Sequence, residues 1–239
     1  LYKRVPQTVQ TGLFQSYRYY VTCPVDNVTP TMVVFKYGGL VMEYGVESLW
    51  PSIEKMAHAT GYRLIVFDYP VAPTTVEIRT ICVAFVRQMA QQYPAMVVCG
   101  LSAGGGLALH VALECPEIIT AVILYYPNVT CMQTPSHTTN QSLRINLLDY
   151  AYYRRMHGHA ELFQCPLFDS RLPLSTVPTL LIRATDDMLD DSHERLITMM
   201  APSVFQTNMR HGFNPGLASD TSSIPAVCRF LKTLSHGNL

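Results

Sequence analysis

A serine between closely spaced glycines is the strongest chemical feature of the sequence. Gly100-Leu101-Ser102-Ala103-Gly104 follows an apolar run, AMVVC, and overlaps the start of a helix-like segment, GGGLALHVAL. A sharp strand-to-helix turn would hold the Ser102 hydroxyl out of the sheet, and it would leave room only for small residues at the two glycine positions. The amino end of the helix favours negative charge at the same place. The pattern predicts a nucleophile, with a purely structural tight turn as the alternative.

A serine hydroxyl is a weak nucleophile until a base accepts its proton and an acid orients that base. Where a serine lies on such a turn, the acid and then the histidine follow it along the chain. LLIRATDDMLDDSH offers Asp186 or Asp187 just after an apolar run, and NMRHGFNPG offers His211 in a late loop before a final helix-like segment. His157 and His159 form a pair, but no metal site is expected there.

The oxyanion that forms when a serine attacks a carbonyl needs backbone N–H donors. Ala103, the residue after the serine, meets that need at the start of the helix. Gly38 and Gly39, in FKYGGL at the end of an earlier apolar run, offer a second backbone segment that can approach the reacting carbonyl without side-chain obstruction. We therefore expect Gly38, Gly39 and Ala103 to form an oxyanion hole.

Short apolar runs rich in Val, Ile and Tyr alternate with segments of helical period, which is typical of a mostly parallel sheet covered by helices. The expected strands are 14–21, 31–37, 62–69, 95–100, 121–126, 179–184 and 203–208, and the expected helices are 47–59, 75–92, 104–114, 192–200 and 222–234. A ligand site is expected where the parallel strands end. We predict one α/β domain, 1–239, with an open, mostly parallel, twisted sheet flanked by helices.

A longer stretch separates the expected strands at 121–126 and 179–184. Within it, INLLDYAYYRRM repeats apolar residues at helical spacing, which predicts a small helical cap inserted over about 129–165. Tyr152 and Met156 of this segment, together with Leu40 and Leu101, are the expected substrate contacts. A surface helix that only covers the core is the alternative.

The composition of the 239-residue chain narrows its partners. Hydrophobic residues make up 49% and charged residues 14%, which indicates a compact globular protein, and 17 basic residues balance 17 acidic ones. Neither nucleic acid nor an anionic membrane is therefore expected as a partner. No apolar run is long enough to span a membrane, and seven cysteines without a CxxC pair favour the cytoplasm over secretion. We expect a small-molecule partner and no cofactor, and a homo-oligomer remains open.

With these residues in place, the chain resembles the hormone-sensitive-lipase-like branch of the α/β-hydrolases, the group of bacterial esterases and arylacetamide deacetylase. The resemblance runs from about 31 to 232. FKYGGL is similar to that family's F-H-G-G-G-F/L, FDYPVAP to D-Y-R-L-A-P, GLSAGGGLA to G-D-S-A-G-G-x-L-A, ATDDMLDD to D-P-L-x-D, and HGF to H-x-F. The resemblance implies an α/β-hydrolase fold with a cap, in which Ser102 is the nucleophile, His211 the base and Asp187, rather than Asp186, the acid.

The sequence departs from the family pattern in the glycine loop. Aligned with F-H-G-G-G-L, it has Lys36 in place of the histidine and Tyr37 in place of the first glycine, which leaves Gly38 and Gly39 as donors. The alternative register puts Tyr37 at the histidine and Leu40 at the third glycine. The expected activity is hydrolysis of small, uncharged esters with short acyl groups. The alternatives are an amidase or deacetylase of an acylated small molecule, and a ligand-binding protein of the same fold without turnover.

Overall fold

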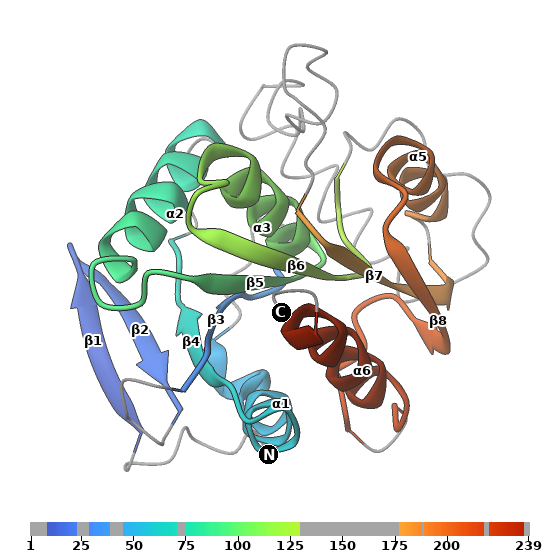
Figure 1. Ribbon diagram of the computed structural model, residues 1–239, viewed down its shortest axis with the longest axis horizontal. Helices are drawn as coiled ribbons and strands as arrows, with labels where there is room; N and C mark the ends of the chain where they lie inside the picture. The colour runs from blue at the N-terminus through green and yellow to red at the C-terminus, as the bar shows by residue number, and fades with distance from the viewer. Residues whose placement is uncertain are drawn as a thin grey trace.

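The computed structural model describes residues 9–22, 29–38, 45–70, 75–129, 177–187, 189–217 and 220–236. Its strands form one eight-stranded sheet in the order β1-β2-β4-β3-β5-β6-β7-β8 (Figure 1). The strands are β1 (Gln10–Phe14), β2 (Tyr17–Val21), β3 (Thr31–Phe35), β4 (Arg63–Phe67), β5 (Met96–Leu101), β6 (Ile119–Tyr125), β7 (Thr179–Asp186) and β8 (Ser203–Arg210). From β4 to β8 every neighbouring pair is parallel, while β1 and β2 pair antiparallel at one edge.

The strands at the centre of the sheet are buried along their whole length. Every residue of β3, β4 and β5 is buried. Apart from Thr31 and Arg63, the first residues of β3 and β4, the apolar residues of these strands are continuous rather than alternating with polar ones. A parallel strand covered by helices on both faces requires such a sequence, because both of its faces must exclude water. The prediction of a mostly parallel sheet is confirmed.

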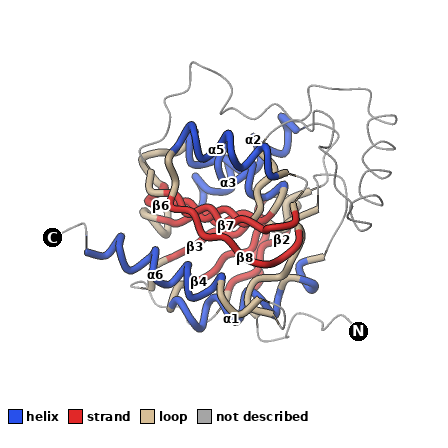
Figure 2. The backbone as a smooth tube through the Cα atoms, turned by 90° about the vertical axis from the view of Figure 1, so that its right-hand side faces the viewer, coloured by secondary structure: helices blue, strands red, loops and turns tan. Residues whose placement is uncertain are grey.

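Helices cover both faces of the sheet, as Figure 2 shows. On one face lie α1 (Trp50–Thr60), preceded by the 3₁₀ helix η1 (Val46–Ser48), and α6 (Ser223–His236). On the other face lie α2 (Thr75–Met89), α3 (Ala103–Glu114) and α5 (Asp190–Met200). Each layer of helices closes its own hydrophobic core against the sheet, with Trp50 and Val227 in one core and Phe85 and Leu107 in the other.

The expected strand at 14–21 was wrong in one respect, since the segment belongs to a hairpin. β1 ends at Phe14, and β2 begins at Tyr17 and returns antiparallel to it. The turn depends on Gln15, whose φ is 55°. Glutamine rarely adopts this conformation, so the sequence carries none of the Gly or Asn signals that mark such turns.

The remaining expected elements agree with the structure within a few residues at their ends. The expected cap at 129–165 lies outside the described residues except for Val129, and so do Tyr152 and Met156. None of the described helices is long and apolar enough to cross a membrane.

Candidate active site

Ser102 lies on the sharp turn that joins β5 to α3. Its φ of 52° and ψ of −117° fall outside the regions that residues with a side chain normally adopt. Three backbone hydrogen bonds hold it there: its N–H donates to the Tyr125 carbonyl at 3.0 Å, and its carbonyl accepts from the N–H groups of Gly105 and Asn128 at 2.8 Å each. The strained conformation is thus fixed by the neighbouring strand and helix.

The glycines on either side of the serine allow the turn to pack this closely. A Cβ at Gly100 would lie 2.1 Å from the Gly104 carbonyl oxygen, and a Cβ at Gly104 would lie 2.2 Å from the Phe35 carbonyl oxygen. Both clashes are with backbone, which cannot move aside as a flexible side chain can. The turn therefore leaves no space for a side chain at either position.

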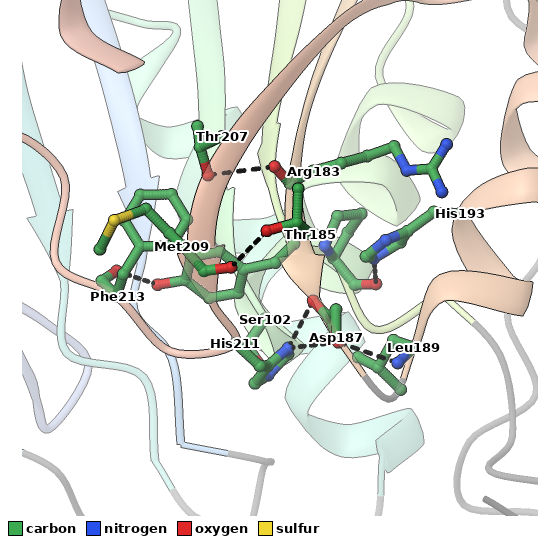
Figure 3. Close-up of polar contacts among 12 residues, drawn as sticks. Ser102, Arg183, Thr185, Asp187, Leu189, His193, Thr207, Met209, His211 and Phe213 are labelled. Atoms are coloured by element: carbon green, nitrogen blue, oxygen red, sulfur yellow. Dashed lines mark hydrogen bonds and ion pairs between the residues drawn. The ribbon is translucent and has the colours of Figure 1, made fainter. Parts of the chain in front are cut away.

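Ser102, His211 and Asp187 form a continuous chain of hydrogen bonds (Figure 3). The Ser102 Oγ lies 2.9 Å from His211 Nε2, and His211 Nδ1 lies 2.9 Å from each carboxylate oxygen of Asp187. With Asp187 ionised, Nδ1 carries the proton that it donates, which leaves Nε2 free to accept the serine proton. The three residues nominated by the sequence come together although β6 lies in the sheet between β5, which the serine follows, and β7, which the acid follows.

The structure also shows how the acid and the histidine are enclosed. The Asp187 side chain is fully buried, and the His211 side chain is 12% exposed. The backbone N–H of Leu189 donates to Asp187 Oδ1 at 2.8 Å, which orients the carboxylate and supports its charge. The imidazole thus keeps a small exposure to solvent while the acid is shielded from water.

Tyr126 is a further member of the site that the sequence reasoning missed. Its ring packs edge-on against the His211 imidazole, with centroids 4.9 Å apart, and its hydroxyl donates to the Phe213 carbonyl at 2.6 Å. Complete burial raises the pKa of Tyr126 well above its usual value, so the phenol keeps its proton and remains a donor. Tyr126 thereby holds the loop that carries the histidine.

His193 performs a similar task on the acid side. It is fully buried in α5, and its Nε2 lies 3.2 Å from the Pro127 carbonyl oxygen (Figure 3). The contact ties α5, which begins just after Asp187, to the loop after β6. The sequence offers no signal for either role, because an aromatic residue at a strand end and a histidine in a helix are both ordinary core residues.

Two of the residues that the sequence nominated as oxyanion donors, Ala103 and Gly38, lie on elements beside Ser102. Ala103 is the first residue of α3, and N–H groups in the first turn of a helix have no partner within the helix. Gly38 follows β3 with a φ of 141°, a conformation that favours glycine. Because Phe35 pairs with Gly100 in the sheet, the loop after β3 leaves the sheet next to the serine turn. Gly39 lies outside the described residues.

Two of the expected substrate contacts need separate comment. Leu101 is 1% exposed and packs in the hydrophobic core on the α1 and α6 face of the sheet, so it does not lie with the polar residues at an open surface. Successive side chains of a strand point to opposite faces, and this position points into the core. Leu40 lies outside the described residues. Among the described residues, no group of three or more His, Cys, Asp and Glu side chains is arranged to hold a metal ion.

Comparison with known proteins agrees with this architecture. Residues 32–212 match a family model described as alpha/beta hydrolase fold. Similar solved structures include a hyperthermophilic esterase from the archaeon Pyrobaculum calidifontis, with 21% identity over 95% of this chain and 85% of that one and a TM-score of 0.75. Carboxyl esterase 2 from the mycorrhizal fungus Tuber melanosporum has 19% identity over 97% and 89% of the two chains, with a TM-score of 0.73.

A third similar structure is the thermophilic carboxylesterase EstE1, cloned from a metagenomic library. It has 20% identity over 93% of this chain and 85% of that one, with a TM-score of 0.72. No curated protein matches the sequence. At these identities the solved structures establish the fold, and the α/β-hydrolase fold predicted from the sequence is confirmed.

Proposed function

The chain belongs to the α/β-hydrolase fold family, and on that premise we propose that it is a serine carboxylesterase acting on small esters with short acyl groups. The observation that carries the proposal is the hydrogen-bonded chain from Ser102 through His211 to Asp187, with distances of 2.9 Å at both links. Its serine lies on a strained turn, at a φ of 52° and a ψ of −117°. Strain of this kind is typical of functional residues.

The first half of the reaction transfers the acyl group to the enzyme. His211 Nε2 accepts the proton of Ser102 as Oγ attacks the ester carbonyl carbon, and the carbonyl oxygen becomes an oxyanion. N–H groups of Ala103 and of the Gly38 loop are the proposed donors to that oxyanion. His211 then gives the proton to the departing alkoxide, so an alcohol leaves and an acyl-serine remains. Asp187 keeps the imidazole in the required tautomer and stabilises its charged form.

The second half returns the enzyme to its starting state. A water molecule takes the place of the alcohol and gives a proton to His211 as its oxygen attacks the acyl carbonyl carbon. The tetrahedral intermediate again carries an oxyanion at the same donors. Collapse breaks the bond to Ser102 Oγ, which recovers its proton from His211, and the carboxylic acid leaves.

The proposed substrate class rests on charge and size. The chain has no net charge and few charged residues, which supports an uncharged substrate. The modest length expected for the cap supports a short acyl group, because a side chain that lines the acyl pocket limits chain length.

The test offers p-nitrophenyl acetate, butyrate and laurate, and a matched acyl anilide, to the purified chain. We expect turnover of acetate and butyrate to exceed that of laurate and the anilide, with a burst of p-nitrophenol if the acyl-enzyme accumulates. Ser102→Ala, the matched control, should lose on the order of 10⁴-fold or more in kcat, and a fluorophosphonate should label the wild type but not this variant.

Each contrary result identifies an alternative. Activity that survives in Ser102→Ala would end the serine mechanism. A preference for the anilide would indicate an amidase or deacetylase. A folded wild type that neither turns over any ester nor reacts with the fluorophosphonate would indicate a binding protein.

A further inference from the structure

A buried lysine stands at the start of the glycine loop. Lys36 directly follows β3 and lies two residues before Gly38, and its side chain is only 8% exposed. An ammonium group loses hydration when it is buried, so it persists there only with compensating partners. Lys36 Nζ forms an ion pair with Asp68, which directly follows β4, and it also lies 5.5 Å from the centre of the Tyr69 ring.

The backbone of Lys36 is fixed on two further sides. The Tyr69 hydroxyl donates to the Lys36 carbonyl at 2.8 Å. Tyr69 is buried, which raises its pKa far above the usual value, so the phenol stays protonated and remains a donor. On the other side, a Cβ at Gly104 would lie 2.5 Å from the Lys36 carbonyl oxygen, which shows that this carbonyl packs against the first turn of α3. Lys36 therefore joins the end of β4 to the helix that begins with Ala103.

The residue after Lys36 is held independently. The Tyr37 hydroxyl lies 2.9 Å from Ser48 Oγ in η1. The course of the chain from Phe35 to Gly38 is thus set by contacts to the end of β4 on one side and to η1 on the other. Gly38 follows at a φ of 141° and has no side chain of its own that could hold the backbone.

We infer that Lys36 is a positioning residue, whose ion pair with Asp68 holds the backbone of residues 36–38 against α3 so that the Gly38 loop can face the oxyanion. The inference rests on the proposed function, since an oxyanion forms only if Ser102 attacks a carbonyl. Lys36 acts through the backbone and not on the substrate. Loss of Lys36 should therefore lower kcat and leave KM nearly unchanged, because the donors bind the oxyanion only as its charge develops.

The first test replaces Lys36 by Met, which keeps the length of the apolar stem and removes the charge. We expect kcat for p-nitrophenyl butyrate, per titrated active site, to fall roughly 10- to 100-fold at nearly unchanged KM, because a displacement of about 1 Å can cost that much. Lys36→Arg, which can keep the ion pair, should recover most of the loss. Lys55→Met, which removes an exposed lysine bonded to the Gly216 carbonyl, is the matched control and should leave kcat unchanged.

A merely structural role would lower the fraction of folded protein without changing kcat per active site. The double variant with Lys36→Met and Asp68→Asn adds a further check. If the two residues act as one unit, its loss of kcat should be no larger than that of the more impaired single variant. Independent, multiplying losses would overturn the assignment to the ion pair.

The second test does not require turnover. Hydrogen-exchange mass spectrometry should show the backbone amides of residues 36–38 exchanging at least about tenfold faster in Lys36→Met than in the wild type, with α6 unchanged. Unchanged exchange at 36–38 would overturn the inference whether or not the wild type hydrolyses esters. Faster exchange with unchanged kcat would also overturn it, because the loop would then move without consequence. If Lys36→Met exchanges faster at 36–38 but the wild type hydrolyses no ester, the result would support the role of Lys36 in holding the backbone and would refute the proposed function.

Discussion

The strain at Ser102 predicts that glycine at this position gives a more stable protein than alanine does. A non-glycine residue held at φ 52° and ψ −117° stores about 1–3 kcal/mol of backbone strain. Glycine adopts such angles freely, although it adds about 0.5–1 kcal/mol of conformational freedom to the unfolded chain. Ser102→Gly should therefore be more stable than Ser102→Ala by about 0.5–2 kcal/mol. Alanine is the correct reference, because both variants lose the 2.9 Å hydrogen bond to His211.

Thermal and urea unfolding of the two variants measure the difference. For a chain of this size, 1 kcal/mol corresponds to roughly 2–4 °C in Tm, so Ser102→Gly should melt about 1–8 °C above Ser102→Ala. Ala201→Gly is a control for the same effect away from the site. Ala201 ends α5 in the left-handed conformation, at φ 45° and ψ 49°, and glycine there should stabilise the wild type by about 0.5–1 kcal/mol.

A gain at Ala201 without a gain at Ser102 would refute the reasoning, because it would mean that the serine turn is relaxed. Both Ser102 variants should lack turnover. The difference in free energy of unfolding between the two variants then measures the backbone strain that the fold tolerates to hold a hydroxyl on this turn.

Three further outcomes follow from the site and the core. Asp187→Asn should lower kcat by on the order of 10⁴-fold, because an amide cannot hold the imidazole tautomer that accepts the serine proton. Asp186→Asn should change kcat little, and equal losses in the two variants would show that the acid was assigned wrongly. Gly104→Ala should destabilise the fold by about 1–3 kcal/mol in urea unfolding and lower turnover, since its Cβ would lie 2.2 Å from a backbone oxygen, and wild-type behaviour would mean that β3 and α3 can separate. Burial, with a smaller contribution from the positive charge of Arg79, lowers the pKa of His110 from 6.5 to about 4. The unfolded chain therefore binds a proton at this histidine more readily than the folded one, so the contribution of His110 to the free energy of unfolding is full above pH 6.5 and falls by up to about 3 kcal/mol as the pH drops toward 4. His110→Gln should flatten that part of the stability curve and the exposed His58→Gln should not; equal curves for both would exclude His110 as the source.

The parallel sheet could be predicted because its strands carry their own signal. Runs such as MVVCG in β5 and AVILY in β6 are apolar at every position, which is what burial on both faces demands. Once the sheet is parallel, residues just past the carboxyl ends of its strands must meet at one edge. That geometry is why Ser102, Asp187 and His211 could be nominated together from positions far apart in the chain.

Contacts made by ordinary residues could not be predicted in this way. Tyr126 and His193 look like core residues in the sequence, and only the three-dimensional structure shows that one supports His211 and the other ties down α5. The burial of Leu101 could not be predicted from its place next to the serine either. It lies in the core on the α1 and α6 face, because the pleat of a strand assigns each residue to a face whatever its neighbours in sequence are.

The pairing of Lys36 with Asp68 lies between these two cases. A lysine in the glycine loop signals a departure from the family pattern, and by itself it predicts an exposed charge. In the structure Phe35 pairs with Phe67, so the residues that follow, Lys36 and Asp68, leave neighbouring parallel strands side by side. The ion pair that compensates for the buried charge of Lys36 therefore depends on the register of β3 against β4. A shift of one residue would bring Lys36 opposite Phe67 or Tyr69, and its ammonium would no longer face the Asp68 carboxylate. A sequence shows the two charges, but their pairing depends on a register that only the packed sheet determines.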